Sequence, residues 1–147
     1  MVFYLDTSIF FFFFDEEFEE YTKALFEYIN RESIEVIYSE VLEGELEEAP
    51  RRVKAMTDKI KRIIYVKPRK SALELADLYI KEGALTEKSK NDAQHIATAT
   101  VEGASVIVSW NFKHMVNFLK IQQYNSINLR KGYRIISIHT PIEIITR

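Results

Sequence analysis

The sequence contains no cysteine among its 147 residues. Disulfide bonds and thiolate-bound zinc are therefore excluded, and only three histidines remain as nitrogen ligands for a metal. There are only four glycines and no Gly-Lys-Ser or Gly-Lys-Thr segment, which excludes the phosphate-binding loop of P-loop nucleotide hydrolases. The first residues show no secretory signal pattern, and no uncharged run approaches the ~20 residues that a bilayer span requires. We expect a soluble, cytoplasmic protein with no membrane partner.

The sequence does have enough apolar material for a core and a very uneven distribution of charge. Hydrophobic residues make up 47% of the chain, so we expect residues 1–147 to form a single domain. The formal net charge is only −2, but residues 15–48 carry 13 acidic and 2 basic side chains, and residues 51–70 carry 9 basic and 1 acidic. This basic block either neutralises nucleic-acid phosphates or forms a solvated helix face.

Short apolar segments alternate with helical patterns along the chain. Strands are predicted at residues 2–5, 35–38, 63–66, 106–108 and 134–138. Helices are predicted at about residues 15–30, from a Ser39 cap towards residue 49, from Pro50 onward, at residues 71–82 and 92–102, and from Asn111. This alternation predicts a parallel α/β sheet with helices on both faces.

Polar residues follow the predicted strands at the positions where ligands bind in such sheets. Asp6 follows the first strand and Asn111 follows the fourth, while Asp92 opens the helix before that strand and can point into the same crevice. Each alone is typical of a turn or a helix cap, but together they gather oxygen ligands, which hard cations such as Mg²⁺ and Mn²⁺ prefer. The pattern indicates a metal-dependent enzyme that cleaves phosphodiesters.

Two motifs give the chain a resemblance to a known family. Tyr4-Leu5-Asp6-Thr7-Ser8 and Asn91-Asp92-Ala93-Gln94-His95-Ile96-Ala97-Thr98-Ala99 resemble the first and third acidic motifs of PIN-domain ribonucleases, of the kind found in VapC-type toxins. With Val108-Ser109-Trp110-Asn111, the resemblance extends over essentially the whole chain. It implies a three-layer α/β/α fold with a central parallel sheet. The implied activity is that of a Mg²⁺- or Mn²⁺-dependent endoribonuclease, the toxin of a type II toxin-antitoxin pair.

The resemblance also implies which residues form the site. Asp6, Glu45 and Asp92 would hold the metal. Glu40 and Glu43 compete with Glu45 for the second position, and only one of them is expected to reach the crevice, because Glu40 and Glu45 lie about 140° apart around a helix. At the fourth position many PIN domains carry an aspartate, whereas this chain has Asn111 in a Ser-Trp-Asn segment that resembles a variant branch of the family. Asn111 offers an oxygen but no negative charge.

The implied reaction is attack by a metal-activated water, which leaves a 5′-phosphate and a 3′-hydroxyl. Thr7 and Ser8 either orient Asp6, bind phosphate or cap a helix, and Ser109 is a further candidate for orienting the substrate. His95 either contacts the substrate or a carboxylate or is a hydrogen-bonded structural residue, and His114 has the same two interpretations. Trp110 is expected to pack beside the site.

Phe10–Phe14 is the most unusual segment, because five consecutive aromatic residues cannot all face one core. Either a partner covers some of them, or a distorted helix buries two or three. In VapC-like proteins the corresponding region lies near surfaces used for dimerisation and antitoxin binding. We therefore expect a homodimer and a possible antitoxin partner, besides the RNA substrate.

Two other functional classes stay open. A catalytically weak or inactive PIN-like module that binds nucleic acid or protein is favoured by Asn111. An acidic α/β phosphatase with a nucleophilic aspartate is disfavoured, because no second Asp lies two residues after Asp6. The sequence leaves open which RNA is cut and whether an antitoxin exists.

Overall fold

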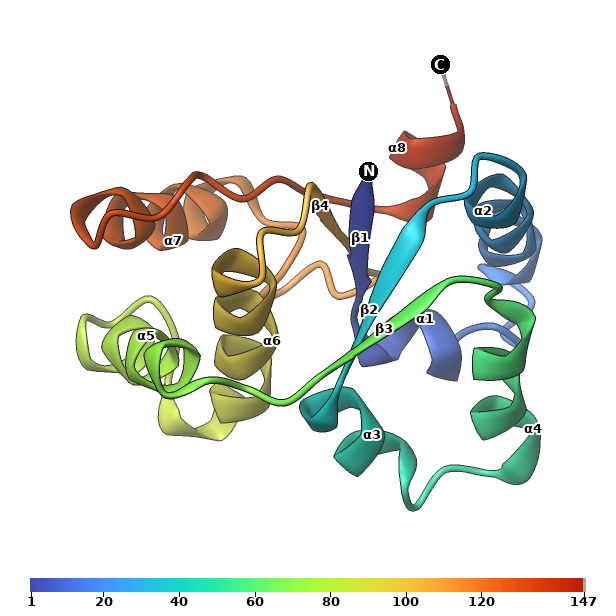
Figure 1. The fold of residues 1–147 in the computed structure, drawn as a ribbon, viewed down its shortest axis with the longest axis horizontal. Coiled ribbons are helices and arrows are strands. Elements are labelled where there is room, and N and C mark those ends of the chain that lie inside the picture. Colours follow the sequence, from blue (N-terminus) through green and yellow to red (C-terminus); the bar gives the residue numbers. More distant parts are fainter. Residues whose placement is uncertain (147) are drawn as a thin grey trace.

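The structure is a computed structural model that describes residues 1–146, and its centre is a five-stranded parallel sheet (Figure 1). The strands are β1 (Val2–Leu5), β2 (Glu35–Ser39), β3 (Ile63–Val66), β4 (Val106–Val108) and β5 (Ile138–His139). Their order across the sheet is β3-β2-β1-β4-β5, and all four pairings are parallel. The predicted three-layer α/β/α fold with a central parallel sheet is therefore confirmed.

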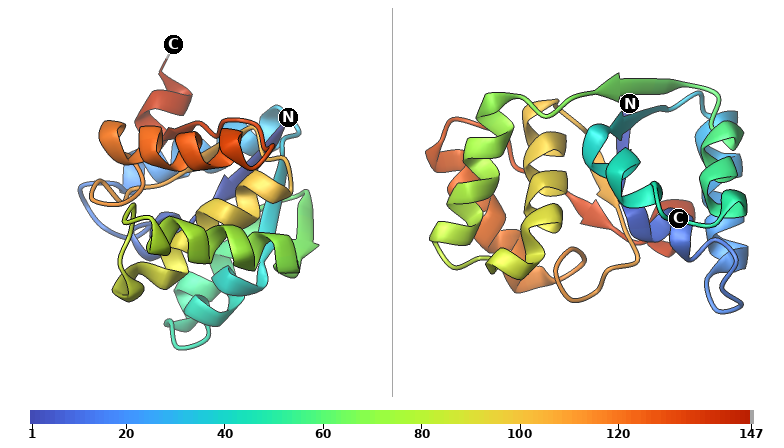
Figure 2. Two further views of the ribbon diagram at one scale, coloured as in Figure 1. Left: turned by 90° about the vertical axis from the view of Figure 1, so that its left-hand side faces the viewer. Right: turned by 90° about the horizontal axis from the view of Figure 1, so that it is seen from below.

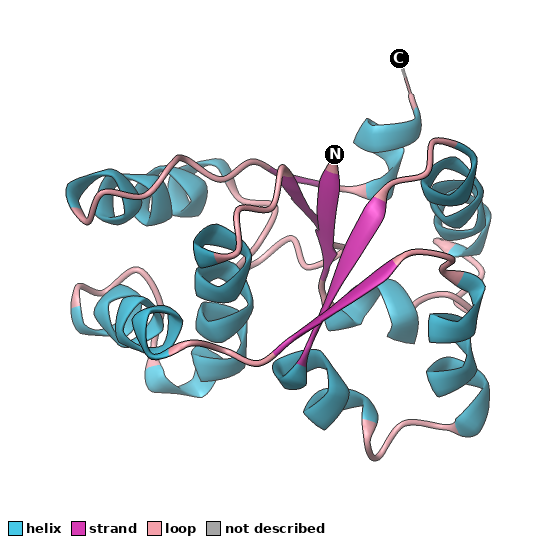
Figure 3. Cartoon of the chain, viewed as in Figure 1, coloured by secondary structure: helices cyan, strands magenta, loops and turns pink. Residues whose placement is uncertain are grey.

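Helices cover both faces of this sheet, as the cartoon in Figure 3 shows. They are α1 (Thr7–Phe11), α2 (Glu19–Arg31), α3 (Glu40–Leu46), α4 (Arg51–Lys54), η1 (Ala55–Lys59), α5 (Lys70–Lys81), η2 (Glu87–Ser89), α6 (Lys90–Val101), α7 (Phe118–Arg130) and α8 (Pro141–Ile145). Helices α2, α4 and α8 lie on one side of the strands and α5, α6 and α7 on the other (Figures 1 and 2). Within residues 1–146, no helix has the length and apolar character needed to cross a membrane.

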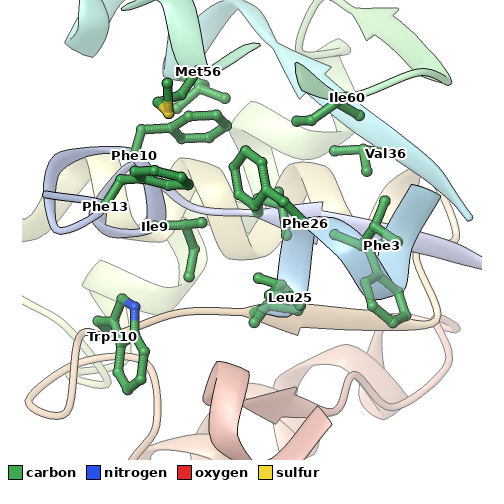
Figure 4. Packing of buried hydrophobic residues seen from close by; sticks show 14 of the residues in the cluster. Phe3, Ile9, Phe10, Phe13, Leu25, Phe26, Val36, Met56, Ile60 and Trp110 are labelled. Carbon is green, nitrogen blue, oxygen red and sulfur yellow. The ribbon is translucent and has the colours of Figure 1, made fainter. Parts of the chain in front are cut away.

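The core consists of two apolar clusters, one on each face of the sheet. Alternate residues of β1 supply both, because Phe3 and Leu5 point to one cluster and Tyr4 to the other. All three residues of β4 are buried, as expected for a central strand of a parallel sheet. Figure 4 shows the cluster on the α2 side, where Phe10, Phe13 and other residues of the α1 region meet α2.

The phenylalanine run divides between this core and the surface. Phe10 and Phe13 are buried, and both rings pack against Phe26 of α2, with ring centroids 6.1 and 5.3 Å apart. Phe11 and Phe12 are 42% and 37% exposed. Phe14 is 36% exposed and lies beneath the guanidinium of Arg52. The run is thus a short helix and turn that buries two rings and presents three.

Two predicted helix starts are wrong. The helix predicted from Asp15 begins at Glu19, because the Asp15 carboxylate accepts a hydrogen bond from the Glu17 amide (2.9 Å) and so stabilises a turn. Asn111 does not open a helix. Instead Asn117 caps α7 by accepting a hydrogen bond from the Lys120 amide (3.1 Å), and residues 111–116 form a loop over the sheet edge.

The last strand is also shorter than predicted. Of residues 134–138, only Ile138 belongs to β5, which pairs with β4 at Ile107 and Val108. The backbone of Ile136 is held by a side chain instead of a strand, since its amide donates to Asn125 Oδ1 (2.7 Å) and its carbonyl accepts from Asn125 Nδ2 (2.9 Å). An asparagine on α7 thus replaces strand pairing at Ile136, while the Ser137 carbonyl still accepts from the Ile107 amide of β4 (2.9 Å).

Replacing Phe10 with alanine is expected to lower the free energy of unfolding by about 3–5 kcal/mol, because it removes a fully buried ring. Replacing the neighbouring, exposed Phe11 or Phe12 with alanine should change it by less than about 1 kcal/mol. Urea denaturation at pH 7 measures both. Equal losses at positions 10 and 11 would contradict this division of the run.

Candidate active site

The predicted site residues come together at the carboxyl ends of the central strands. Asp6 directly follows β1, Ser109 follows β4, and α3, which carries Glu45, follows β2. The first turn of α6 brings Asp92 to the same end of the sheet. This is the lower end of the sheet in Figure 1, and the right-hand view of Figure 2 faces it.

Asp6 is the most deeply buried of the three predicted acids, with 3% of its surface exposed. Its Oδ1 accepts hydrogen bonds from the hydroxyl (2.5 Å) and the amide (3.2 Å) of Ser8, and its Oδ2 accepts one from the Ser109 hydroxyl (2.8 Å). The Ser8 hydroxyl in turn accepts from the Trp110 amide (2.9 Å), which ties the first motif to the fourth. Ser8 and Ser109 therefore orient Asp6, and the Ser8 amide is engaged by this carboxylate.

Asp6 carries an unfavourable charge in this setting. Burial raises its pKa to about 6, against the opposing effects of His95 and of the Ser8 and Ser109 hydroxyls, and the nearby charge of Asp92 raises it further. No Lys or Arg among residues 1–146 forms an ion pair with Asp6. The direct contacts of the carboxylate are therefore hydrogen bonds.

Of the three candidate glutamates on α3, only Glu45 faces this region, while Glu40 and Glu43 are exposed. Glu45 Oε1 accepts hydrogen bonds from the Thr7 hydroxyl (2.7 Å) and from Nε2 of His95. Partial burial opposes its ionisation, but the interactions with His95 and Thr7 hold the pKa of Glu45 below its usual range. Thr7, a candidate for orienting Asp6, binding phosphate or capping a helix, donates to Glu45 in the structure.

His95 is buried within α6 and links Glu45 to the sheet. Its Nδ1 lies 2.5 Å from the hydroxyl of Tyr4, which lies 2.7 Å from the hydroxyl of Ser39, the N-cap of α3. Burial raises the pKa of Tyr4 above its usual value, so the phenol stays neutral. No role for Tyr4 follows from the motif alone. One feature of the sequence could have indicated a role for Tyr4. It is the only hydroxyl-bearing residue of an apolar, buried strand, and a buried hydroxyl needs a hydrogen-bond partner.

Asp92 has its own hydrogen-bond donors. Its Oδ2 lies 2.9 Å from Nδ1 of His114 and 3.4 Å from Nδ2 of Asn111. The Asn111 oxygen accepts from the amides of Lys113 (3.1 Å) and His114 (3.0 Å). Asn111 therefore fixes the loop that carries His114 through its side-chain oxygen, which already accepts from two amides. It contacts Asp92 through its side-chain nitrogen.

Trp110 lies beside the site, as predicted. Its ring packs against Phe18 with centroids 4.3 Å apart, and its Nε1 donates to the Thr22 hydroxyl (3.0 Å). It is buried, so base stacking is not available to it in this arrangement. Its role is to anchor the loop after β4 to α2.

The donor chemistry of the site fits a divalent cation, although the ligands are not assembled around one point. Among residues 1–146, no three His, Asp or Glu side chains form a group that could hold a metal. The charge of Asp92 raises the pKa of the buried Asp6 carboxylate, and a hard cation bound by these oxygens would relieve this repulsion. Glu45, held through Oε1, is the third predicted ligand.

Comparison with known proteins identifies the family. Residues 3–113 match the family model of the PIN domain. The chain belongs to the PIN domain family. PIN domains are generally nucleases and typically use divalent metals. A comparison with curated proteins gives no significant sequence match.

The fold comparison agrees with this assignment. The PIN domain described here is similar to a chain in the crystal structure of VapBC2 from Rickettsia felis bound to a DNA fragment from their promoter. The TM-score is 0.62 at 14% sequence identity, and the match covers 94% of this chain and 98% of the other. At this identity the likeness concerns the fold. The family resemblance read from the motifs is confirmed.

The buried charge of Asp6 predicts a specific pH dependence of stability. The pKa of Asp6 is about 6 in the folded protein and 3.8 in its ordinary state, so the folded protein binds the proton more tightly. The cost of this carboxylate is therefore absent below about pH 4, develops between pH 4 and 6, and is complete at pH 7.

Removal of the charge should reverse this cost. The difference in unfolding free energy between Asp6→Asn and the unmodified protein should move by about 3 kcal/mol in favour of the variant between pH 4 and pH 7. Denaturation in EDTA at both pH values measures it, with Asp77→Asn on the exposed side of α5 as the control. A difference that stays constant with pH would show that Asp6 titrates normally.

Proposed function

We propose that this PIN domain is a cytoplasmic, metal-dependent endoribonuclease that hydrolyses RNA phosphodiester bonds. The observation that carries the proposal is the matched support of three carboxylates at one end of the sheet. Ser8 and Ser109 hold Asp6, Thr7 and His95 hold Glu45, and His114 with Asn111 holds Asp92. Such preorganised oxygen ligands are what catalysis of phosphodiester hydrolysis by a divalent cation needs.

In this proposal Asp6, Glu45 and Asp92 hold Mg²⁺ or Mn²⁺, which lowers the pKa of a bound water and neutralises the phosphate oxygens. The three acids have different roles in holding the ion. Asp6 is buried and fixed between two strands, whereas Glu45 and Asp92 are partly exposed and reach the site from helices. Asp6 therefore anchors the ion, and the other two face the substrate side.

The basic block supplies a second support for a nucleic-acid substrate. All nine of its Lys and Arg side chains are exposed, on α4, η1, the segments on either side of β3, and the first residue of α5. Exposed cations of this density bind a phosphate backbone without reading its sequence. Arg52, Arg69 and Lys70 also contact Phe14, Glu102 and Glu74.

Cleavage of a mixed-sequence single-stranded RNA in Mn²⁺ or Mg²⁺ tests the activity. Asp92→Asn and Glu45→Gln should each lower the rate at least about 100-fold, because each removes a predicted ligand. Glu43→Gln is the matched control for Glu45, since it makes the same change on the exposed side of the same helix. EDTA should abolish cleavage by the unmodified protein.

The alternative is a PIN-like module that binds nucleic acid or protein with little or no turnover. It is favoured by Asn111, which brings no charge to the fourth position and contacts Asp92 as a donor. Folded protein, free of any bound partner, that cuts no RNA in either metal would support this alternative. Equal loss of activity in Glu43→Gln and Glu45→Gln would instead contradict the choice of Glu45.

We further propose a toxin role with an antitoxin partner, and a homodimer. Support comes from the exposed rings of Phe11, Phe12 and Phe14 and from the VapBC2 complex, whose name joins a toxin-like chain to a second protein. Light scattering at micromolar concentration should give the mass of a dimer. Phe11→Ser combined with Phe12→Ser should shift it towards monomer, and Leu73→Ser, at a similarly exposed position, should not. A monomeric unmodified protein would reject the dimer.

A further inference from the structure

A line of buried polar groups runs beneath Glu45, from the start of α3 to the site. The Leu42 amide donates to the Ser39 hydroxyl (3.2 Å), which contacts the Tyr4 hydroxyl (2.7 Å). Tyr4 contacts His95 Nδ1 (2.5 Å), and His95 Nε2 contacts Glu45 Oε1. Ser39, Tyr4 and His95 are all almost completely buried, and they come from three different elements.

Only one direction of hydrogen bonding along this line gives every hydroxyl and ring N–H donor an acceptor. Ser39 donates to Tyr4, Tyr4 donates to His95 Nδ1, and the proton on Nε2 is donated to Glu45. In the opposite direction His95 donates to Tyr4 and Tyr4 to Ser39, which leaves the Ser39 hydroxyl proton with no acceptor among residues 1–146. An unpaired buried donor is costly, so the chain of donors ends on the carboxylate.

The surroundings make these polar groups expensive to keep. Tyr4 lies in the apolar cluster between the sheet and α6, with residues such as Ile37 and Ile96, and the buried His95 packs against its ring. Phenylalanine would fill the place of Tyr4 with no hydroxyl to satisfy. The rings of Tyr4 and His95 meet edge to face, 5.5 Å apart at 73°, which fixes the plane of the imidazole. A hydrogen-bonded line of this kind specifies one geometry, and it ends at Glu45 and the adjacent Thr7 hydroxyl.

We propose that Tyr4 and His95 are positioning residues that hold the second acid of the site through its Oε1. Thr7 donates to the same oxygen, and its hydroxyl lies 3.2 Å from His95 Nε2, so two adjacent donors set the orientation of the carboxylate. The consequence is tighter binding of the divalent cation, because Glu45 does not have to be ordered when the ion binds. The inference rests on the proposed function in that the cation is the one used by the nuclease.

Mn²⁺ binding, followed by electron paramagnetic resonance of the purified protein, tests this without any turnover. His95→Met should weaken the affinity about 10- to 100-fold, and Tyr4→Phe should weaken it in the same direction. His95→Gln should recover most of the affinity, because its side-chain amide still presents a donor to Glu45. Tyr79→Phe is the matched control. It removes another fully buried hydroxyl, one that donates to Asn128 on α7, and should leave Mn²⁺ affinity unchanged even where stability falls.

The ¹⁵N resonances of His95 supply an independent readout. The proton should reside on Nε2 in the unmodified protein, and the Nδ1 signal should shift in Tyr4→Phe. Three results would overturn the proposal: no measurable Mn²⁺ binding by the unmodified protein, unchanged affinity in Tyr4→Phe and His95→Met, or an equal loss in Tyr79→Phe. Failure of the nuclease proposal is distinct, since it would appear as normal Mn²⁺ binding and normal variant effects without RNA cleavage.

Discussion

The carboxylate of Asp6, at the end of the central strand and almost completely removed from water, determines how the surrounding loops are arranged. The hydroxyls of Ser8 and Ser109 and a backbone amide converge on Asp6, and burial raises its pKa to about 6 against the opposing effects of His95 and of the two hydroxyls. These donors come from the segments after β1 and β4. Stabilising the one charge therefore fixes the two loops that border the site, and it brings Trp110 and Asn111 into place behind it.

The same constraint explains why so much of the site could be predicted from sequence. Parallel strands end at one edge of a sheet, so residues that follow them directly must meet there, as Asp6 and Ser109 do. Asp92 could be placed because a helix start has the same relation to that edge. Short apolar strands and helical spacing were likewise sufficient to predict the fold. A strand that is buried on both faces of a parallel sheet has a continuous run of apolar residues, which can be recognised in the sequence.

What could not be predicted depends on side-chain contacts between distant segments. Asn111 was expected to begin a helix, but its amide oxygen caps a loop and its nitrogen contacts Asp92, a choice decided by tertiary neighbours. The contact of Thr7 with Glu45 could not be predicted, because the two residues lie 38 positions apart in the sequence. Tyr4 received no role because a tyrosine in a buried strand is usually read as an apolar residue, and the partner that satisfies its hydroxyl lies 91 positions away.

The edges of the sheet have a consequence for how this protein can associate. One edge strand, β3, has only four residues, with Lys61 and Arg62 before it and Lys67 after it, and the other, β5, has two residues and leads at once into the capped helix α8. Short strands flanked by charge resist the addition of a foreign strand. Association with other chains must therefore use side-chain surfaces. Side-chain contacts select a partner by its sequence, whereas pairing of backbone strands does not.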